Sequence, residues 1–429
     1  MYFHSTRGAE KLKVSEAINK GLAKDGGLFV PETWPELKPE SFAGLNDISD
    51  IAYKLIKPFF KDDPLESELK DICDNAFNFD VPVEWLGDKN NLGILELFHG
   101  PTSAFKDFGA RFLAQCLSRL EQDSNDKLNI LVATSGDTGG AVAGAFDGMD
   151  AIDVVVLYPA GLVSPRQEHQ LCCWSDNIHS VRVDGRFDDC QDLVKKAFTN
   201  QGFSEKYRLT SANSISIGRL LPQMSYYALS SLQHWRKTGE KLNYIIPAGN
   251  VGNSLACIWA RKIGMPIGEI ILATNINKTI PDYLKSAKWS PRESHATLAS
   301  AMDVGNPSNM ERMRHLMPEH GDLTSAVSAY SVSDEEIKKN IKEVWATWNY
   351  MICPHTATAF HVYSHMTEQK KRKTWVLAAT AHPAKFETIV EPLLGEKVPV
   401  PESLKDLLDR PVHRVDIKPE LSELDKVLG

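Results

Sequence analysis

The chain has 429 residues, of which 42% are hydrophobic, and its formal net charge is -8 at pH 7. This length allows two or three domains with sizeable cores. Basic residues are scattered, apart from 370–373, so no patch indicates nucleic-acid binding. There is no signal peptide and no apolar run of membrane-spanning length. The seven cysteines form neither CxxC motifs nor a paired framework, so we expect a reduced, cytoplasmic protein.

The first ninety residues are predicted to form a small N-terminal region. Helical patterns occur at 14–21 and 48–60. Between them, glycines at 26 and 27 and prolines at 31, 35 and 39 interrupt any regular element. We therefore expect residues 1–92 to pack as a separate region onto the main body.

From about residue 128 onward, short apolar runs alternate with amphipathic segments of helix length. This alternation is typical of an α/β fold with parallel sheets covered by helices. A polar, turn-like stretch at 237–241 indicates a break between two units, predicted as domains 93–238 and 239–429. Strands are predicted at 128–133, 153–158, 178–183, 242–246, 269–273 and 375–379. Helices are predicted at 140–146, 188–199, 219–235, 254–263, 334–348, 355–365 and 385–394.

A lysine flanked by aromatic residues precedes a helix-like run at 107–115. Lys106 lies close to Phe105 and Phe108 in the sequence. Aromatic surface removes water from an amine, which favours the neutral, nucleophilic form that condenses with an aldehyde cofactor. A lysine whose stem covers apolar surface while its ammonium reaches water is the commoner arrangement, so Lys106 alone decides nothing.

Two glycine-rich turns each follow a predicted strand and precede a predicted helix, at 133–140 and 247–254. This geometry presents unpaired backbone N–H groups and the positive end of a helix to an anion. Neither turn is GxGxxG, and the chain has no Gly-Lys pair, which excludes a Walker A loop. Such turns also occur as purely structural connections, but two of them rich in Ser, Thr and Asn favour two bound anionic groups.

A third segment, 211–221, places Asn213, Ser214 and Ser216 ahead of Arg219 at the start of a helix. Hydroxyl and amide donors beside a guanidinium would clamp a phosphate or carboxylate. The alternative is a helix cap followed by an exposed arginine. A fourth segment ends a strand in Thr380, whose hydroxyl would either meet a ring nitrogen or cap the next helix.

The sequence gives no sign of a metal site. HExxH and zinc-finger spacings are absent, and the thirteen histidines are dispersed. His99, His355 and His382 are interpreted as satisfied core or loop residues. The acyl-transfer motif GxSxG is also missing.

Taken together and in this order, these segments closely resemble the threonine synthases, pyridoxal-phosphate enzymes of fold type II. The resemblance covers nearly the whole chain and is carried by 5–8, 21–31, 99–112, 134–139, 211–214, 249–252, 301–304 and 380–386. It implies two open twisted sheets covered by helices, with an additional N-terminal region. It also implies a carbon–oxygen lyase that converts O-phospho-L-homoserine and water to L-threonine and phosphate.

The resemblance also assigns roles to individual residues. Lys106 would form the Schiff base with pyridoxal phosphate and shuttle protons, Thr380 would meet the pyridine nitrogen, and Asp137 would face the ring oxygen. Aspartate at that position would need a proton or a nearby donor. The backbone of Gly249, Asn250, Val251, Gly252 and Asn253 would cradle the cofactor phosphate. The substrate carboxylate is assigned to Thr134, Ser135 and Thr138, and the substrate phosphate to Asn213, Ser214 and Arg219.

Three points stay open at this stage. Ser216 stands where close relatives usually carry asparagine, which puts one donor of the phosphate clamp in doubt. A phospho-lyase that releases 2-oxobutyrate from the same substrate would need the same motifs, and a noncatalytic protein on this scaffold is a further alternative. The sequence is compatible with a monomer or a homodimer.

Overall fold

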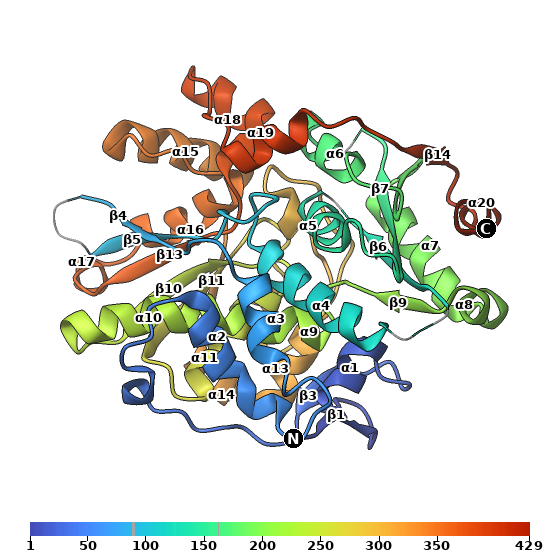
Figure 1. Cartoon of the computed structure of the whole chain (residues 1–429). Coiled ribbons are helices and arrows are strands. Elements are labelled where there is room, and N and C mark those ends of the chain that lie inside the picture. Colours follow the sequence, from blue (N-terminus) through green and yellow to red (C-terminus); the bar gives the residue numbers. More distant parts are fainter. Residues whose placement is uncertain (88–90, 123, 125, 135, 162) are drawn as a thin grey trace.

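A computed structural model describes residues 1–87, 91–122, 124, 126–134, 136–161 and 163–429. The described chain contains three sheets and the helices that cover them (Figure 1). Two of the sheets are largely or wholly parallel, and the third is a small antiparallel sheet near the N-terminus. The predicted α/β architecture with two open sheets and an added N-terminal region is therefore confirmed. No described helix is both long enough and apolar enough to cross a membrane.

The larger sheet has six strands in the order β12-β11-β10-β13-β5-β4, and only β4 runs antiparallel to its neighbour. Its central strands are buried along their whole length, as expected for strands covered on both faces. The strands are β4 (Val83–Trp85), β5 (Leu92–Glu96), β10 (Leu242–Pro247), β11 (Ile267–Thr274), β12 (Ser328–Ser331) and β13 (Trp375–Ala379).

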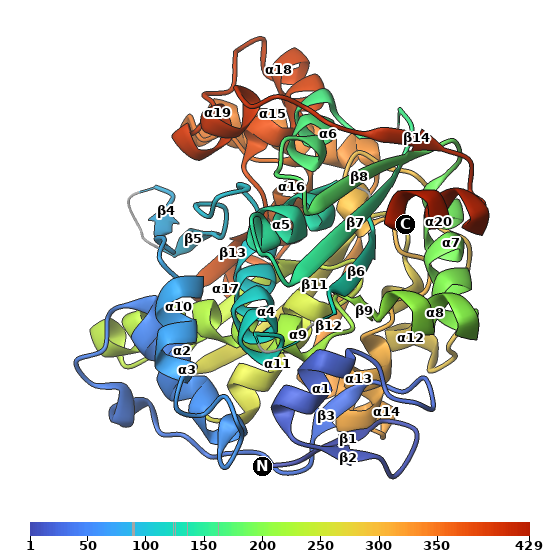
Figure 2. The same ribbon diagram turned by 45° about the vertical axis from the view of Figure 1, so that its right-hand side comes forward.

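The second sheet has five parallel strands in the order β14-β8-β7-β6-β9. Its strands are β6 (Leu128–Ala133), β7 (Ile152–Pro159), β8 (Ile178–Val183), β9 (Leu209–Ser211) and β14 (Val415–Ile417). Figure 2 shows the C-terminal segment crossing the molecule to place β14 at the edge of this sheet, beside β8.

The N-terminal region forms a three-stranded antiparallel sheet, β2-β1-β3, and several helices. The elements are β1 (Phe3–Ser5), β2 (Lys11–Leu12), α1 (Val14–Lys20), β3 (Phe29–Pro31), η1 (Pro39–Phe42), α2 (Ile48–Ile56), η2 (Lys57–Phe60) and α3 (Leu69–Ala76). Helices α1 and α3 pack against α4 (Lys106–Leu120), and α2 packs against α10 (Met224–Thr238). This region therefore supports the helix that carries Lys106.

The remaining helices follow or connect the strands of the two larger sheets. Before residue 239 they are α5 (Asp137–Phe146), α6 (Pro165–Cys172), α7 (Phe187–Thr199), α8 (Gln201–Tyr207), α9 (Ile217–Leu220) and η3 (Leu221–Gln223). After it they are α11 (Gly252–Lys262), α12 (Thr279–Ser286), η4 (Ser300–Met302), α13 (Met310–Leu316), α14 (His320–Ala326), α15 (Asp334–Trp348), α16 (Pro354–Ser364), α17 (Glu368–Lys371), η5 (Pro383–Phe386), α18 (Glu387–Leu394), α19 (Glu402–Leu408) and α20 (Leu421–Leu428).

Strand pairing links stretches that are distant in the sequence. β5, which follows the N-terminal region, pairs with β13, while β14 from the C-terminal stretch pairs with β8. Each of the two larger sheets thus includes a strand that lies far in the sequence from the strand beside it. The boundaries at 92/93 and 238/239 remain a sequence-based division, and the sheets themselves do not follow it.

The prediction of one continuous helix at 219–235 is wrong in one respect, because the structure has three shorter helical pieces there. Helix α9 ends at Leu220, a 3-10 turn contains Pro222, and α10 begins at Met224. Proline has no backbone N–H and clashes with the preceding turn, so it interrupts the helix there. The bend places Arg219 on a separate short helix.

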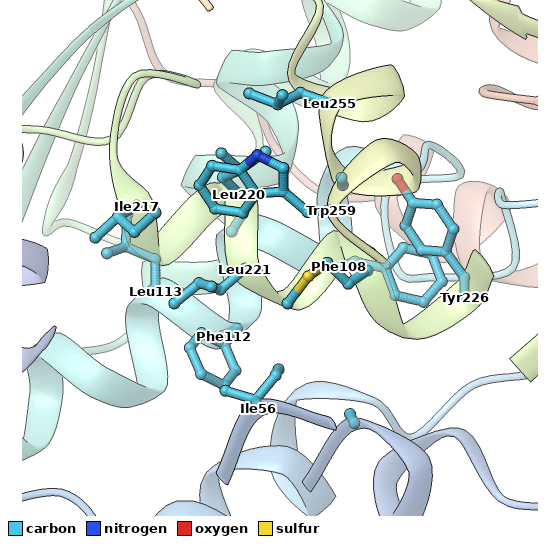
Figure 3. Packing of buried hydrophobic residues seen from close by; sticks show 14 of the residues in the cluster. Ile56, Phe108, Phe112, Leu113, Ile217, Leu220, Leu221, Tyr226, Leu255 and Trp259 are labelled. Carbon is cyan, nitrogen blue, oxygen red and sulfur yellow. The ribbon is translucent and has the colours of Figure 1, made fainter. Parts of the chain in front are cut away.

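The largest hydrophobic core lies beneath α4 and fixes its position. Phe108, Phe112 and Leu113 of α4 are buried together with Trp259 of α11 and Tyr226 of α10 (Figure 3). The rings of Phe108 and Tyr226 lie 4.9 Å apart between centroids in an edge-to-face arrangement. This packing fixes the position of α4, and Lys106 is the first residue of that helix.

Candidate active site

Lys106 is the first residue of α4, and the loop before it is paired with the end of β13. The backbone N–H of Phe105 donates to the carbonyl of Thr380 at 2.9 Å, and that of His382 donates to the carbonyl of Ser103 at 3.0 Å. Ser103 itself is buried with φ at +55°, a conformation unfavourable for a residue with a side chain. These contacts bring the predicted Schiff-base lysine and the predicted strand-end threonine side by side.

The amine of Lys106 lies in a partly desolvated and electropositive environment. Its Nζ is 5.8 Å from the ring centroid of Phe105, whereas Phe108 packs into the core against Phe79 and Tyr226. Burial and the charges of Arg219 and Lys385 lower the pKa of Lys106 to about 8, although Asp137 opposes the shift. About a tenth of the amine is therefore neutral and nucleophilic at pH 7, far more than for an ordinary lysine.

Asp137 begins α5 at the end of β6 and is buried. Its Oδ1 is 3.0 Å from the Nζ of Lys385 and accepts a hydrogen bond of 3.0 Å from Nε2 of Gln167. Burial alone would raise the pKa of Asp137, but the charges of Lys385 and Lys106 outweigh burial and lower it below its ordinary value. The donor that the sequence required for this carboxylate is thus Lys385, helped by Gln167.

The glycine-rich turn before α5 depends on a side chain that we had assigned to the substrate. The hydroxyl of Thr134 accepts hydrogen bonds from the N–H groups of Gly136 and Gly139, at 3.0 and 2.9 Å. It therefore stabilises the turn itself. Thr138 is half-buried and is not hydrogen-bonded through its hydroxyl to any residue that the structure describes. Ser135 lies outside the described residues.

Gly136 shows why this turn needs glycine. Its φ is +136°, and a Cβ at this position would lie 2.7 Å from Nε2 of Gln167. A side chain would both strain the backbone and displace the donor to Asp137. The turn is therefore shaped to bring Gln167 against the carboxylate.

The second glycine-rich turn joins β10 to α11. Val251 caps α11 with φ at +67°, a strained conformation for a β-branched residue, and strain of this kind is concentrated at ligand sites. The first N–H groups of an α-helix have no partner within the helix, so those of Gly252 and Asn253 remain available to an anion. A Cβ on Gly249 would lie 2.8 Å from Cα of Met302, so the turn is held tightly against η4. The side chain of Asn253 serves packing, since Oδ1 accepts from the hydroxyls of Tyr226 and Tyr227.

The predicted phosphate clamp adjoins this turn. Nδ2 of Asn250 donates to Oγ of Ser214 at 2.6 Å, which links the two segments directly. Arg219 is 3% exposed, which contradicts the alternative of an exposed arginine after a helix cap. One of its terminal nitrogens donates to the carbonyl of Ala212 at 2.5 Å, whereas its Nε has no hydrogen-bond partner in the described chain. Burial lowers the pKa of Arg219 to about 10, so the guanidinium remains charged at neutral pH.

Asn213 and Ser216 complete the clamp segment. Asn213 is half-buried, and its carbonyl accepts from the N–H of Ser216 at 3.0 Å. Ser216 is fully buried, and its hydroxyl has no partner among the described residues. The Ser216 hydroxyl and the Nε of Arg219 are thus two buried donors of this segment that have no partner within the described residues.

Two further residues of the site were not recognised as functional in the sequence, Lys385 and His355. Lys385 is fully buried and donates to the carbonyl of Thr102 at 2.6 Å as well as contacting Asp137. Burial, together with the charges of Lys106 and Lys385, lowers the pKa of His355 to about 4, whereas Asp137 opposes the shift. The Nε2 of His355 accepts a hydrogen bond of 3.1 Å from the N–H of Ala301. The apolar residues around Lys385 in the 380–386 segment were the only sequence signal for its burial.

A second buried arginine, Arg312 of α13, supports the clamp from behind. It is fully buried, and its guanidinium donates to the carbonyl of Phe29, to Oδ1 of Asn309 and to the carbonyl of Ile215, at 2.9, 2.8 and 2.7 Å. Burial lowers the pKa of Arg312 to about 9. It thus ties the N-terminal sheet to the clamp segment.

Replacing Arg312 with methionine is expected to lower the free energy of unfolding by about 2–4 kcal/mol, since three buried acceptors lose their donor. Urea unfolding measures the effect. Arg372→Met, at an exposed arginine, serves as the control and should change stability by less than about 0.5 kcal/mol. Equal stability of the two variants would show that the three hydrogen bonds contribute nothing to folding.

Comparisons with known proteins agree with this arrangement. Residues 88–381 match the family model described as pyridoxal-phosphate dependent enzyme, residues 2–77 the one for the threonine synthase N terminus, and residues 356–428 the one for the C-terminal part of threonine synthase. Threonine synthase of Haemophilus influenzae is 40% identical over 92% of this chain and 91% of its own length. That of Escherichia coli is 37% identical over 98% of this chain and 97% of its own length.

Solved structures give the same result. The crystal structure of the Escherichia coli threonine synthase superposes with a TM-score of 0.91 at 36% identity, covering 100% of this chain and 99% of that one. A pyridoxal-phosphate-bound threonine synthase from Brucella melitensis superposes with a TM-score of 0.91 at 30% identity, covering 100% and 98%. The chain therefore belongs to the threonine synthase family of pyridoxal-phosphate-dependent enzymes.

Proposed function

We propose that this chain converts O-phospho-L-homoserine and water into L-threonine and phosphate, using pyridoxal phosphate as its cofactor. Similarity to threonine synthases over nearly the whole chain supports the reaction. The observation that carries the substrate assignment is Arg219, a buried guanidinium whose Nε is unpaired within the described chain and whose charge acts on the amine of Lys106. An amino-acid substrate that carries a phosphate would bring the anion that this position needs.

The residues present suit the cofactor. Its phosphate would be held by the backbone of Gly249–Asn253 at the N-terminus of α11, where unpaired N–H groups and the helix dipole favour an anion. Its ring nitrogen would accept from the hydroxyl of Thr380, which is not hydrogen-bonded to any described residue. Bound pyridoxal phosphate supplies an aldehyde for amines and a ring that withdraws electrons from the neighbouring carbon.

The remaining residues of the site would orient the substrate and move protons. The neutral Nζ of Lys106 would take the proton from the substrate α-carbon and return it later, because its lowered pKa allows both states near neutral pH. Thr138, with the N–H groups at the start of α5, would bind the α-carboxylate. Asn213, Ser214 and Arg219 would hold the phosphate before and after it leaves.

We further infer a cytoplasmic location and a monomeric or homodimeric state. The seven cysteines are buried free thiols, which suits a reducing compartment.

Incubating the purified protein with O-phospho-L-homoserine and measuring threonine, 2-oxobutyrate and phosphate tests the proposal. Threonine and phosphate in equal amounts are expected. 2-Oxobutyrate as the main product would instead identify a phospho-lyase. Absence of both, together with absence of bound pyridoxal phosphate, would leave a noncatalytic protein on this scaffold.

A further inference from the structure

The pair formed by Lys385 and Asp137 is enclosed in the protein. The two side chains are 1% and 3% exposed, and the Lys385 Nζ lies 3.0 Å from Asp137 Oδ1. Lys385 also donates to the carbonyl of Thr102, and Gln167 donates to the same Asp137 oxygen. Both donors therefore act on Oδ1, and no donor among the described residues reaches Oδ2. One oxygen of the carboxylate is fixed and the other is left for a ligand.

The pair joins the two larger sheets. Asp137 follows β6 of the five-stranded sheet, and Lys385 follows β13 of the six-stranded sheet. The same contact is reinforced at α6, where Oγ of Ser164 donates to the carbonyl of Lys385 at 2.9 Å and Arg166 donates to the carbonyl of Ala384 at 2.7 Å. The position of the carboxylate thus depends on how the two sheets are apposed.

The charged and titratable groups that act on Asp137 come from three other elements. They are Lys106 of α4, Lys385 of η5 and His355 of α16. His355 is neutral above about pH 4, so the ionisation of Asp137 is favoured by the two lysines. Lys106 must lose its charge to act as a nucleophile, so Lys385, 3.0 Å from Asp137, is the counter-charge on which the carboxylate then depends.

We propose that Lys385 is a positioning residue for the reaction: it holds Asp137 as an ionised acceptor, with Oδ2 directed at the hydroxyl on the cofactor ring. The inference rests on the proposed function. The cofactor hydroxyl would then donate its proton in a hydrogen bond to Asp137. Removing Lys385 would leave Lys106 as the only positive charge acting on the buried carboxylate, so the carboxyl would take up a proton more readily and would then accept the hydrogen bond of the cofactor more weakly.

A double-mutant cycle tests the pair through pyridoxal-phosphate affinity, measured on the full chain by the absorbance of bound cofactor. Lys385→Met should weaken binding about 10–100-fold, the loss expected for one hydrogen bond to a charged group. Once Asp137 is changed to Asn, the further change Lys385→Met should alter affinity less than about threefold. Lys397→Met, at an exposed lysine paired with Glu391, is the matched control and should leave affinity unchanged.

Thermal unfolding of the cofactor-free chain between pH 7 and 5 supplies a readout that packing alone would not move. In the unchanged protein the pKa of Asp137 is lowered, so the ionised carboxylate stabilises the fold until the pH falls below the pKa of aspartate in the unfolded chain, near pH 4. Its contribution to stability is therefore constant between pH 7 and 5. In Lys385→Met the largest charge that opposes burial is gone and only Lys106 remains, so the pKa of the Asp137 carboxyl should rise and the deficit in Tm should shrink as the pH falls. The double variant Lys385→Met/Asp137→Asn retains Lys106 and His355, and its Tm deficit should show no such trend.

Two outcomes would overturn the inference. One is a Lys385→Met deficit that stays constant with pH. The other is a large loss of affinity on adding Lys385→Met to Asp137→Asn, which would mean that Lys385 acts on another group. The double variant removes both partners of the buried pair together and is therefore expected to fold, so this second arm remains decisive if Lys385→Met alone does not fold. Failure of the unchanged protein to bind pyridoxal phosphate would contradict the proposed function instead, and the pH arm would be unaffected.

Discussion

Replacing Lys106 with alanine is expected to lower kcat/KM for O-phospho-L-homoserine at least about 10³-fold and to abolish the visible absorbance of bound cofactor. The change removes both the nucleophilic amine and the group that would move the α-proton. Folding should be preserved, because alanine is favourable in a helix and Asp137 keeps Lys385 as its counter-charge. Steady-state kinetics and an absorbance spectrum measure the two effects.

Lys262→Ala is a suitable control, because Lys262 also lies over an aromatic ring, 5.4 Å from the centroid of Trp34, but on the surface. It should keep full activity. The unchanged protein offers a second check, in the rate at which cofactor-free protein takes up pyridoxal phosphate. That rate should rise with pH, reach half its maximum near pH 8 and level off above it, as the Lys106 amine loses its proton. A rate still rising beyond about pH 10 would indicate an ordinary lysine.

The fold could be predicted to a large extent from local patterns. Strands β6, β8 and β13 were expected at the residues where they occur, because continuous apolar runs bounded by turn residues are typical of buried parallel strands. β5 was missed, although it is an inner strand of the larger sheet, between β13 and β4. It is only five residues long and includes Gly93, whose missing side chain makes room for Val83 and Trp85. Its place in the sheet depends on pairing with residues almost 300 positions away.

Prediction of the site was limited by the same dependence on distant contacts. The five segments, which are the Lys106 stretch, the two glycine-rich turns, 211–221 and the end of β13, were found because glycine turns, hydroxyls and a lysine are local signals. The structure brings them together. Lys385 could not be assigned, since a lysine is ordinarily exposed and its partner Asp137 is 248 positions away in the sequence. The sequence also did not reveal that the hydroxyl of Thr134 accepts from two N–H groups of its own turn, and its assignment to the substrate stays a prediction.

Replacing Arg219 with alanine is expected to lower kcat/KM for O-phospho-L-homoserine roughly 10²–10³-fold, with little change in pyridoxal-phosphate affinity. The reason is that a buried guanidinium which pairs with a substrate phosphate contributes several kcal/mol. Inorganic phosphate should inhibit the unchanged protein in competition with the substrate and should inhibit Arg219→Ala far less. Kinetics with and without phosphate, and cofactor titration, measure these three quantities separately.

The separation between substrate and cofactor effects is what identifies the role of Arg219. Its contact with the carbonyl of Ala212 and the close approach of Gly109 to its Nε, 2.8 Å from a Cβ placed there, show that it also packs against α4. If packing were its only role, Arg219→Ala would displace Lys106 and weaken cofactor binding as much as substrate use. Arg111 of α4 also donates to backbone carbonyls, those of Ala76 and Asn75. The variant Arg111→Ala therefore gives the size of the loss in substrate use that follows from a structural change alone. A loss of substrate use no larger than that of Arg111→Ala would remove Arg219 from the phosphate site, whereas a selective loss would mean that its guanidinium binds the substrate phosphate.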